Sequence, residues 1–498
     1  MSINDFSYHT VNTMDILLSH GYFIAEDEHE QQIMKPYPTL GLLYISSHLK
    51  AKGFAVDLYD STFETLAKFE KHLQQTRPGV VGLYCNLMTK QNVLKMVQMC
   101  KNIGATVIVG GPEPPHYAEA YLDSGTDIVV IGEGELTLEE LIPHLAKHGL
   151  HRLETIPGIV FRNETGEVVK TPPRPQIPDL SGQPWPDRDA IPMPRYLETW
   201  KTYHGLSSVS LITARGCPYT CTWCSHSVFG ETHRRRTPQD VAEEVAWIKA
   251  QYNPDQLWYA DDVFTIHTRW FLQYADELKQ RGLRIPFECI SRADRLNDKI
   301  IDALAEMGCY RLWIGAESGS QRILDAMQRR ADVEDVQAKT KMLQARGIEV
   351  GMFIMLGYQS EEVADIEATV DHLKKSNPDI FLTTVAYPIK GTKFYSKVEN
   401  HIVSHLDWAV RTDRDLKVAG RYSKRFYDYA TRWMVNEVNL HKQRVAGSNN
   451  YLQMGKMFLN ARRGRVGMWL ARNEREEDSG QFANGRGWSA QERAIDGW

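Results

Sequence analysis

The feature that most limits what this chain can fold into is a repeated alternation of short apolar runs with longer amphipathic segments. Such runs are typical of buried parallel strands joined by crossover helices. The first part of the chain contains four of them, at residues 15–18, 80–84, 106–109 and 127–131. The pattern predicts a doubly wound, Rossmann-like α/β domain over residues 1–169, in which a ligand binds at the carboxyl ends of the strands.

A second series of runs predicts a second domain. Residues 170–200 are rich in proline and polar residues, and we expect them to form an extended linker. Residues 201–400 then carry six strand-like runs, each followed by polar or glycine residues and a helical pattern. These runs lie at residues 209–214, 256–260, 286–290, 310–314, 351–356 and 383–387. The sequence therefore predicts a partial (β/α)6 barrel, whose site also lies at the strand carboxyl ends.

The end of the chain departs from this alternation. Residues 401–472 read as a mostly helical C-terminal domain, basic and rich in aromatic residues, and residues 473–498 as a flexible tail. The stretch from Met454 to Leu470 is amphipathic and basic, a combination that can touch a membrane surface. We expect this region to cap the barrel, and we do not expect membrane contact.

Composition indicates a soluble, cytoplasmic protein. Of the 498 residues, 42% are hydrophobic and 24% are charged, and the net charge of −5 argues against nucleic acid as a partner. The start, Met1 to Thr13, is polar and mixed, which does not fit a secretory signal peptide. Seven cysteines, three of them clustered, indicate a cofactor site in a reducing compartment and not a disulfide framework.

The clustered cysteines follow the first strand-like run of the second domain. Cys217, Cys221 and Cys224 have a C-x3-C-x2-C spacing. Three thiolates this close can each bind one iron of a [4Fe–4S] cluster, which in its usual form has four cysteine ligands. A missing fourth ligand leaves one iron open to a substrate, as a catalytic zinc keeps one open position. The spacing alone also fits a zinc site, or a cluster with a distant fourth cysteine.

Polar residues and glycine follow the other strands of the predicted barrel. These are Asp261 and Asp262 after the second run, Ser291 and Arg292 after the third, Glu317 after the fourth and Gly357 after the fifth. Such residues offer hydrogen-bond acceptors, donors and close backbone approach to a ligand. A paired aspartate at a strand end can by itself be a helix cap.

Residues 205–395 resemble the radical S-adenosylmethionine (SAM) enzymes in the cysteine spacing and in the residues that follow the strands. In that family the open iron chelates the amino and carboxylate groups of SAM, and one electron then releases a 5′-deoxyadenosyl radical. The resemblance implies that the three cysteines hold the cluster and that Asp261 or Asp262 binds the methionine ammonium group. The family often has Gly-Gly-Glu where this chain has Asp-Asp, so which carboxylate makes the contact stays open.

The same resemblance assigns the remaining strand-end residues. Glu317 stands where the family hydrogen-bonds the ribose, and Ser291 and Arg292 stand where side chains reach the ribose or the carboxylate. Trp223 and the backbone at Gly357 flank the adenine. The basic run of residues 233–236 is interpreted in two ways, as a solvated loop before a helix or as a clamp for a phosphate or carboxylate.

Glycine-rich sequences follow two strands of the first domain, and this region resembles the cobalamin-binding domain found ahead of many radical SAM cores. A large corrinoid with a nucleotide tail needs a strand-end crevice and close backbone approach. The residues that the resemblance assigns to cobalamin are Gly110, Gly111, Pro112, Gly132, Glu133 and Gly134, with Asn86, Leu87 and Met88 as further lining. A nucleotide-binding or purely structural domain is the alternative, and Leu87 and Met88 also fit a plain core.

One departure from cobalamin domains concerns the ligand below cobalt. The family motif Asp-x-His-x-x-Gly supplies a histidine there, whereas the corresponding region of this chain, taken as residues 57–62, has none. We therefore expect cobalamin to bind without a protein histidine on cobalt.

As a whole the chain most resembles the group of anaerobic magnesium-protoporphyrin monomethyl ester cyclase-like enzymes and class B methyltransferases. That resemblance implies a [4Fe–4S] cluster, SAM and cobalamin as cofactors, a small-molecule substrate, and an external electron donor such as flavodoxin or ferredoxin. The implied reaction is methylation of an unactivated carbon or of phosphorus through methylcobalamin. The alternatives are a cobalamin-assisted oxidation, cyclisation or rearrangement without methyl transfer, and a non-catalytic carrier or sensor.

Overall fold

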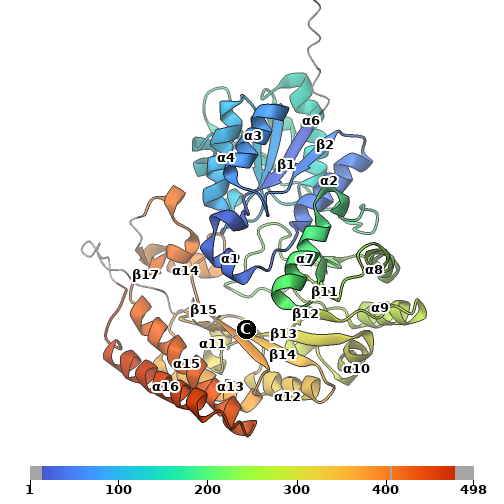
Figure 1. Ribbon diagram of the computed structural model, residues 1–498. Helices are drawn as coiled ribbons and strands as arrows, with labels where there is room; N and C mark the ends of the chain where they lie inside the picture. Colours follow the sequence, from blue (N-terminus) through green and yellow to red (C-terminus); the bar gives the residue numbers. More distant parts are fainter. Residues whose placement is uncertain (1–13, 404–405, 477–498) are drawn as a thin grey trace, which may run out of the picture. The chain divides into compact units, whose positions relative to one another are not determined.

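The computed structural model describes residues 14–403 and 406–476, which form two compact units (Figure 1). The first unit runs up to Tyr203 and also takes in two short segments from later in the chain, Ser227–Phe229 and Trp408–Val410. The second unit contains the rest of the chain. Trp408 is held on the first unit because its carbonyl accepts a hydrogen bond from Nζ of the buried Lys90, at 2.7 Å.

The first unit is built on a seven-stranded sheet in the order β2-β1-β3-β4-β5-β6-β7. Strands β1 to β5 are parallel, and β6 and β7 extend the sheet antiparallel. The strands are β1 Ile16–His20, β2 Val56–Tyr59, β3 Val80–Tyr84, β4 Thr106–Gly110, β5 Ile128–Val130, β6 Ile159–Arg162 and β7 Val168–Lys170. The order reverses between β1 and β3, which is where doubly wound sheets bind their ligands.

Helices cover both faces of this sheet, because successive strand residues point to opposite sides. Leu17 of β1 packs into the core under α3 and α4, whereas Ile16 and Leu18 pack into the core under α2 and α6. Figure 1 shows α3 and α4 together on one side of the strands and α2 on the other. The helices are α1 Glu28–Ile33, α2 Leu40–Ala51, α3 Leu66–Thr76, α4 Lys90–Asn102, α5 Ala118–Asp123, α6 Glu135–His148 and α7 Met193–His204.

The proline-rich segment packs on this unit. Oδ2 of Asp187 accepts hydrogen bonds from Ser46 Oγ at 2.6 Å and from Lys50 Nζ at 2.7 Å, both on α2. The amide of Ile177 donates to Oε2 of Glu133 at 2.8 Å. Residues 170–200 therefore run along the first unit and end in α7.

The second unit is built on six parallel strands in sequential order, β8-β11-β12-β13-β14-β15. They are β8 Ser208–Leu211, β11 Gln256–Tyr259, β12 Phe287–Ser291, β13 Cys309–Glu317, β14 Glu349–Leu356 and β15 Ile380–Val385. Strands β8 and β15 are the two edges and do not pair with each other, so the sheet is the predicted partial barrel. The helices that follow the strands are α8 Pro238–Tyr252, α9 Thr268–Gln280, α10 Asp298–Met307, α11 Gln321–Ala326, α12 Val333–Gln344, α13 Val363–Ser376 and α14 Lys393–Val398.

The unit is completed by two small ribbons and a helical pair. Strands β9 (Ala214–Arg215) and β10 (Arg234–Arg235) pair antiparallel, as do β16 (Ile402–Val403) and β17 (Lys417–Val418). The long helices α15 (Lys424–Val445) and α16 (Tyr451–Leu470) lie side by side. No helix in the described ranges is both long and apolar enough to cross a bilayer.

Candidate active site

The three predicted cluster cysteines lie on one loop of the second unit. The β9–β10 ribbon closes the base of this loop, and Nδ1 of His233 lies 3.1 Å from the carbonyl oxygen of Gly216. Cys217 and Cys221 are buried and Cys224 is half-buried. Desolvation, and after it the neighbouring thiols and Asp262, raises the pKa of Cys224 to about 12. The loop thus places three thiols close together, and their thiolate forms would need a positively charged group nearby.

Thr222, between two of the cysteines, anchors the loop to the barrel. Its amide donates to the carbonyl of Met327 at 3.0 Å, and its carbonyl accepts from the amide of Phe394 at 2.7 Å. Its hydroxyl lies 2.5 Å from the hydroxyl of Tyr358, the second residue after β14. These contacts hold the loop against three separate elements of the second unit.

Two arginines face the sulfur of Cys221. Nη1 of Arg292 lies 4.0 Å from Sγ and Nη1 of Arg329 lies 3.8 Å from it. Arg292 also stacks on the ring of Tyr219 at 3.8 Å and donates to the carbonyls of Arg329 and Arg330. Both guanidinium groups are buried, so they supply the positive charge that a thiolate needs here.

The two adjacent aspartates after β11 have different environments. Asp261 is 2% exposed, and its carboxylate accepts from the amide and hydroxyl of Thr213, the amide of Ala214 and Nη2 of Arg235. It therefore ties the end of β11 to the segment that leads into the cysteine loop. Asp262 is exposed, yet desolvation and after it the charge of Asp261 raise its pKa. Desolvation raises the pKa of Cys217 and Cys224, and the nearby charge of Asp262 adds to that effect.

Two arginines of the basic run before α8, residues 233–236, are neither solvated nor open to a ligand. Arg235 donates to Asp261 and to the carbonyl of Phe264, and its guanidinium stacks on Trp270 at 4.2 Å. Arg236 is buried and pairs with Asp240 and Glu244. The solvated-loop interpretation and the phosphate-clamp interpretation are therefore both wrong for Arg235 and Arg236, because carboxylates inside the protein balance their charges.

Ser291 and Glu317 also lie at strand ends, both buried. The Ser291 hydroxyl is 2.5 Å from that of Thr265, so it has a partner within the protein. Glu317 ends β13 in a left-handed conformation, with φ of 61°, and its Oε1 lies 4.0 Å from Nε of Arg329. Burial raises the pKa of Glu317 to about 7, an effect that Arg329 and Arg292 partly offset. The carboxyl group can therefore accept or donate a hydrogen bond near neutral pH.

Gly357, which follows β14, and Trp223 of the cysteine loop have different surroundings. The φ of Gly357 is 74°, and a Cβ there would lie 2.4 Å from Nη2 of Arg421 and 2.9 Å from the ring of Tyr427. Glycine is required at this turn for both reasons. Trp223 packs beside a cluster that includes Met355 and Tyr358, residues just before and after Gly357.

In the first unit, the glycine-rich turns lie at the strand ends as predicted, but two of their glycines serve the protein itself. A Cβ on Gly111 would lie 2.2 Å from the carbonyl oxygen of Cys85, and one on Gly134 would lie 2.7 Å from Cδ1 of Ile45. Clearance for a ligand is therefore not what demands glycine at these positions. Gly110 and Gly132 have no neighbour closer than 3.6 Å to such a Cβ.

The other residues assigned to cobalamin have mixed surroundings. Oδ1 of Asn86 accepts from the amides of Met88 and Thr89 and so closes the turn before α4. Leu87 is half-buried and Met88 is 55% exposed, so Met88 is not a core residue. Pro112 lies in the turn after β4, and Glu133 holds the proline-rich segment through Ile177.

A histidine that the sequence analysis did not consider lies beside residues 57–62. His20, at the end of β1, is 2% exposed, and its Nε2 lies 3.0 Å from Oδ1 of Asp60. Its Nδ1 accepts from the amide of Tyr22 at 3.3 Å, so both ring nitrogens have partners. Tyr196 of α7 donates to the same Asp60.

Comparison with known proteins connects both units to one family. Residues 211–373 match the radical SAM superfamily, and residues 33–142 match the B12 binding domain. The chain is 31% identical over 392 residues to an uncharacterized methyltransferase of Pyrococcus horikoshii, an alignment that covers 76% of this chain and 82% of that protein. The chain belongs to the cobalamin-dependent radical SAM enzymes. Its cofactors are a [4Fe–4S] cluster, SAM and cobalamin.

Other relatives of this radical SAM enzyme carry different names. It is 25% identical over 361 residues to an anaerobic magnesium-protoporphyrin IX monomethyl ester cyclase of Rubrivivax gelatinosus, covering 70% of this chain and 64% of that one. It is 26% identical over 415 residues to a cytidylyl-2-hydroxyethylphosphonate methyltransferase of Streptomyces wedmorensis, covering 72% and 77%. The solved structure of the cobalamin-dependent SAM radical enzyme OxsB shares the fold, with a TM-score of 0.70 at 17% identity over 92% of this chain and 72% of that one.

The residues of the cysteine loop fit the cluster of a radical SAM enzyme. Nε1 of Trp223 and Nε2 of His226 are buried there without a hydrogen-bond partner, which is typical of polar atoms that face a missing group. No three cysteine, histidine or carboxylate side chains in the described part of the chain lie close enough to share one metal ion. A cluster does not need such a group, since each cysteine binds its own iron.

Arg329 is the residue of this site that sequence reasoning missed. It lies between α11 and α12, outside every strand end, where no pattern marks it. Only the fold brings its guanidinium to both Cys221 and Glu317. The fold likewise brings Tyr358 to Thr222, a contact that the sequence does not indicate.

Proposed function

We propose that this enzyme transfers a methyl group from SAM to an unactivated carbon or phosphorus centre of a small molecule. The observation that carries the proposal is the presence, in one chain, of a B12-binding domain and the three-cysteine loop, in a sequence 31% identical to a protein named as a methyltransferase. Cys217, Cys221 and Cys224 would hold the cluster, which would supply the electron that cleaves SAM, and bound cobalamin would supply a carrier for the methyl group.

The residues of the second unit have separable roles in this proposal. Asp262 accepts a hydrogen bond from the ammonium group of SAM, because Asp261 is already occupied by four donors. Glu317 bonds the ribose, and its pKa near 7 lets it accept from or donate to a hydroxyl. Arg292 and Arg329 stabilise the Cys221 thiolate through N–H···S contacts.

The backbone at Gly357 and the ring of Trp223 flank the adenine. In the first unit, Gly110, Gly132, Met88 and the neighbouring strand-end residues line the cobalamin site. His20 would not bind the metal of a cobalamin held there, because both nitrogens of that ring already have partners in the first unit.

A cyclisation, oxidation or rearrangement without methyl transfer is the second candidate, and the cyclase of Rubrivivax gelatinosus among the relatives favours it. The two candidates differ in how they consume SAM. Methyl transfer produces S-adenosylhomocysteine in addition to 5′-deoxyadenosine, whereas the second candidate produces 5′-deoxyadenosine alone. A carrier or sensor produces neither.

The test is an anaerobic incubation of the reconstituted enzyme with cobalamin, a reductant and SAM labelled in its methyl group. We expect both nucleoside products by mass spectrometry, and label in cobalamin. A Cys221→Ala variant, which lacks one cluster ligand, is the control and should give no 5′-deoxyadenosine. Absence of S-adenosylhomocysteine from an enzyme that still makes 5′-deoxyadenosine would refute methyl transfer.

We further propose that the electron comes from flavodoxin or ferredoxin and that the enzyme works in the cytoplasm. The support for the cytoplasm is the cysteine usage: all seven thiols are unpaired in the structure, as expected in a reducing compartment. Reduction of the cluster by purified flavodoxin, followed by its absorbance, tests the choice of donor.

A further inference from the structure

Helix α16 has small residues on its buried face and large apolar residues on its exposed face, the reverse of an ordinary surface helix. Its buried residues are Ala461, Gly464, Gly467 and Met468. A Cβ on Gly464 would lie 2.6 Å from the backbone nitrogen of Trp433, and one on Gly467 would lie 2.4 Å from the ring of Tyr429. The glycines therefore let α16 pack closely on α15 and leave its larger side chains facing outward.

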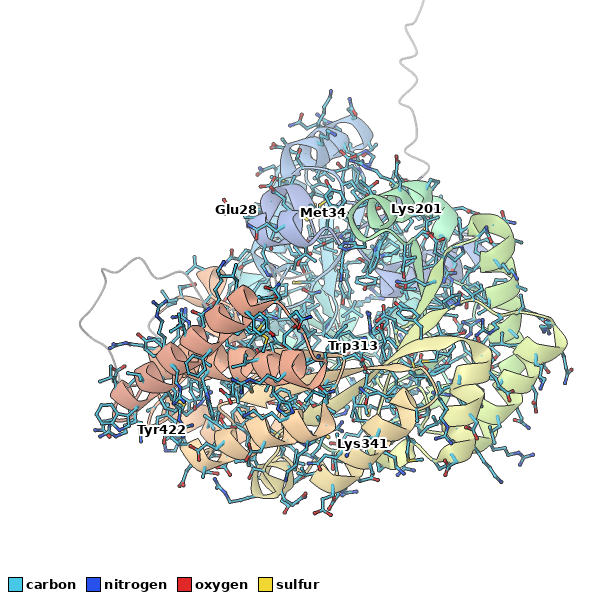
Figure 2. The ribbon with its side chains drawn as sticks, turned by 60° about the horizontal axis from the view of Figure 1, so that its bottom comes forward. Glu28, Met34, Lys201, Trp313, Lys341 and Tyr422 are labelled. Atoms are coloured by element: carbon cyan, nitrogen blue, oxygen red, sulfur yellow. The ribbon has the colours of Figure 1, made fainter. Side chains whose placement is uncertain are left out.

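The outward face carries a stripe of exposed apolar residues that Lys456 and Arg463 interrupt. Leu452, Leu459, Val466 and Leu470 are 83%, 56%, 57% and 59% exposed. Their spacing of seven, seven and four residues puts them on one line along the helix. Aromatic residues border the stripe, with exposures of 74% for Tyr451, 41% for Phe458 and 58% for Trp469. Figure 2 shows the helical pair along one side of the second unit, with its side chains drawn as sticks.

The charged residues of α16 itself are all basic. Residues 438–473 contain no aspartate or glutamate, although the whole chain has a net charge of −5. Lys456 and Arg463 are exposed at stripe positions, and Arg462 is exposed beside them. Arg462 stacks on Phe458 at 5.2 Å and Arg472 on Trp469 at 4.1 Å. An aromatic ring under a cationic group is suited to the boundary between lipid headgroups and acyl chains.

An apolar pocket of about 320 Å³ adjoins the stripe. It lies between α16 and the start of α13, and it shares Val466 and Trp469 with the exposed face. Arg465 and Arg472 are at its rim. Nη2 of Arg465 pairs with Glu367 of α13, whereas its Nη1 is buried without a hydrogen-bond partner. An apolar recess with arginines at its rim can take an acyl chain whose anionic headgroup binds the arginines.

We propose that α16 rests in the surface of an anionic lipid bilayer, with its apolar stripe among the acyl chains and its basic residues at the headgroups. A helix of 20 residues, about 30 Å long, with Trp, Phe and Leu beside Lys and Arg has the composition of an interfacial helix. The uniform positive charge makes an anionic bilayer the occupant. This inference replaces our expectation of no membrane contact, and it does not depend on the reaction that the enzyme catalyses.

The test is flotation of the full-length protein with vesicles of phosphatidylcholine, with and without phosphatidylglycerol. We expect binding only to the anionic vesicles, and weaker binding as the salt concentration rises. The double variant Leu459→Asp/Val466→Asp should lower the vesicle-bound fraction at least about tenfold, and Arg462→Glu/Arg463→Glu should do the same, since each basic residue near the surface contributes about 1 kcal/mol. All four positions are exposed, so the variants should keep the circular dichroism and melting temperature of the parent.

Matched controls come from the first unit. Leu150 is 44% exposed, and Lys71 and Lys95 are exposed on α3 and α4. Leu150→Asp and Lys71→Glu/Lys95→Glu change the same kinds of residue and should leave vesicle binding unchanged. Equal binding by all variants, or no binding of the parent to anionic vesicles, would overturn the proposal. A dimer in analytical ultracentrifugation that Leu459→Asp/Val466→Asp abolishes, without vesicle binding by the parent, would show instead that a second copy covers the stripe.

Discussion

Neighbouring aspartates with opposite surroundings allow a sharp test of the SAM site. Asp261 and Asp262 are adjacent in sequence and share a charge, yet Asp261 is 2% exposed and Asp262 is exposed. If Asp262 binds the ammonium group of SAM, Asp262→Asn should impair SAM binding and leave folding intact. Asp261→Asn should do the reverse and act first on stability.

The magnitudes follow from the hydrogen bonds. The Asp261 carboxylate accepts from the amide of Thr213 at 2.6 Å, from its hydroxyl, and from Nη2 of Arg235 at 3.2 Å. Removing one member of a buried ion pair costs about 3–5 kcal/mol, and Asn, which keeps one carbonyl oxygen, should cost about half of that. Asp262→Asn should change stability by less than about 0.5 kcal/mol. It should weaken SAM binding about ten- to a hundredfold, since a hydrogen bond to a charged group contributes about 1.5–3 kcal/mol.

Three measurements on each variant separate the effects: iron content after anaerobic reconstitution, thermal unfolding of the apoprotein, and equilibrium binding of SAM. For Asp262→Asn we expect full iron, an unchanged melting temperature and weak SAM binding. For Asp261→Asn we expect a lower melting temperature, with SAM affinity retained in the molecules that hold a full cluster. Unchanged SAM affinity in Asp262→Asn, or a stable Asp261→Asn protein that fails to bind SAM, would refute this division of roles.

Further predictions concern the cluster, the cobalamin domain and pH. Replacing all three loop cysteines by alanine should abolish iron binding, and iron and sulfide retained in full would contradict the assignment. Arg329→Met should lower the reduction potential of the cluster in a redox titration, since it removes a positive N–H donor from Cys221; an unchanged or higher potential would contradict this. Gly111→Val should reduce soluble expression even without cobalamin, because its Cβ would meet the Cys85 carbonyl; a stable variant that only loses cobalamin would restore the ligand-clearance reading. Burial lowers the pKa of His372 to about 4, so near pH 5.5 only the unfolded chain gains a proton at this residue. Between pH 7.5 and 5.5 the parent protein should therefore lose about 1 kcal/mol more unfolding free energy, measured in urea, than the His372→Gln variant loses. Equal losses in the two proteins would contradict this.

The alternation of strands and helices was predictable because buried parallel strands are apolar on both faces. Five of the six predicted runs in the second unit overlap the observed strands closely, and 383–387 overlaps the end of β15 (Ile380–Val385). Edge strands were harder to predict. Strand β2 (Val56–Tyr59) has aspartate and tyrosine among its four half-buried residues, so it lacks the apolar run that marked its neighbours. The predicted tail falls mostly outside the described residues, but Arg475 bridges to Tyr422 within them.

The candidate site was predictable where residues follow a strand and unpredictable where the fold brings distant loops together. Cys221, Asp262 and Glu317 all lie within seven residues of the end of a strand-like run. Arg329 and Tyr358 reach the cysteine loop through contacts between segments more than 100 residues apart. The exposed stripe of α16 was missed for a related reason: the sequence shows which residues are small and which are large, and only the packing against α15 shows that the small ones face inward.

The second unit separates residues that hold the cysteine loop from residues that can reach a ligand. Asp261, Ser291 and Thr222 all have close partners inside the protein. Exposed Asp262 and the unpartnered ring nitrogens of Trp223 and His226 lie on or beside the same loop. Because unsatisfied buried polar atoms are costly, they persist where a bound group completes them. The anchoring residues position the loop before any cofactor arrives, so substitutions among them should act on folding first, and substitutions among the unpartnered residues should act on cofactor binding.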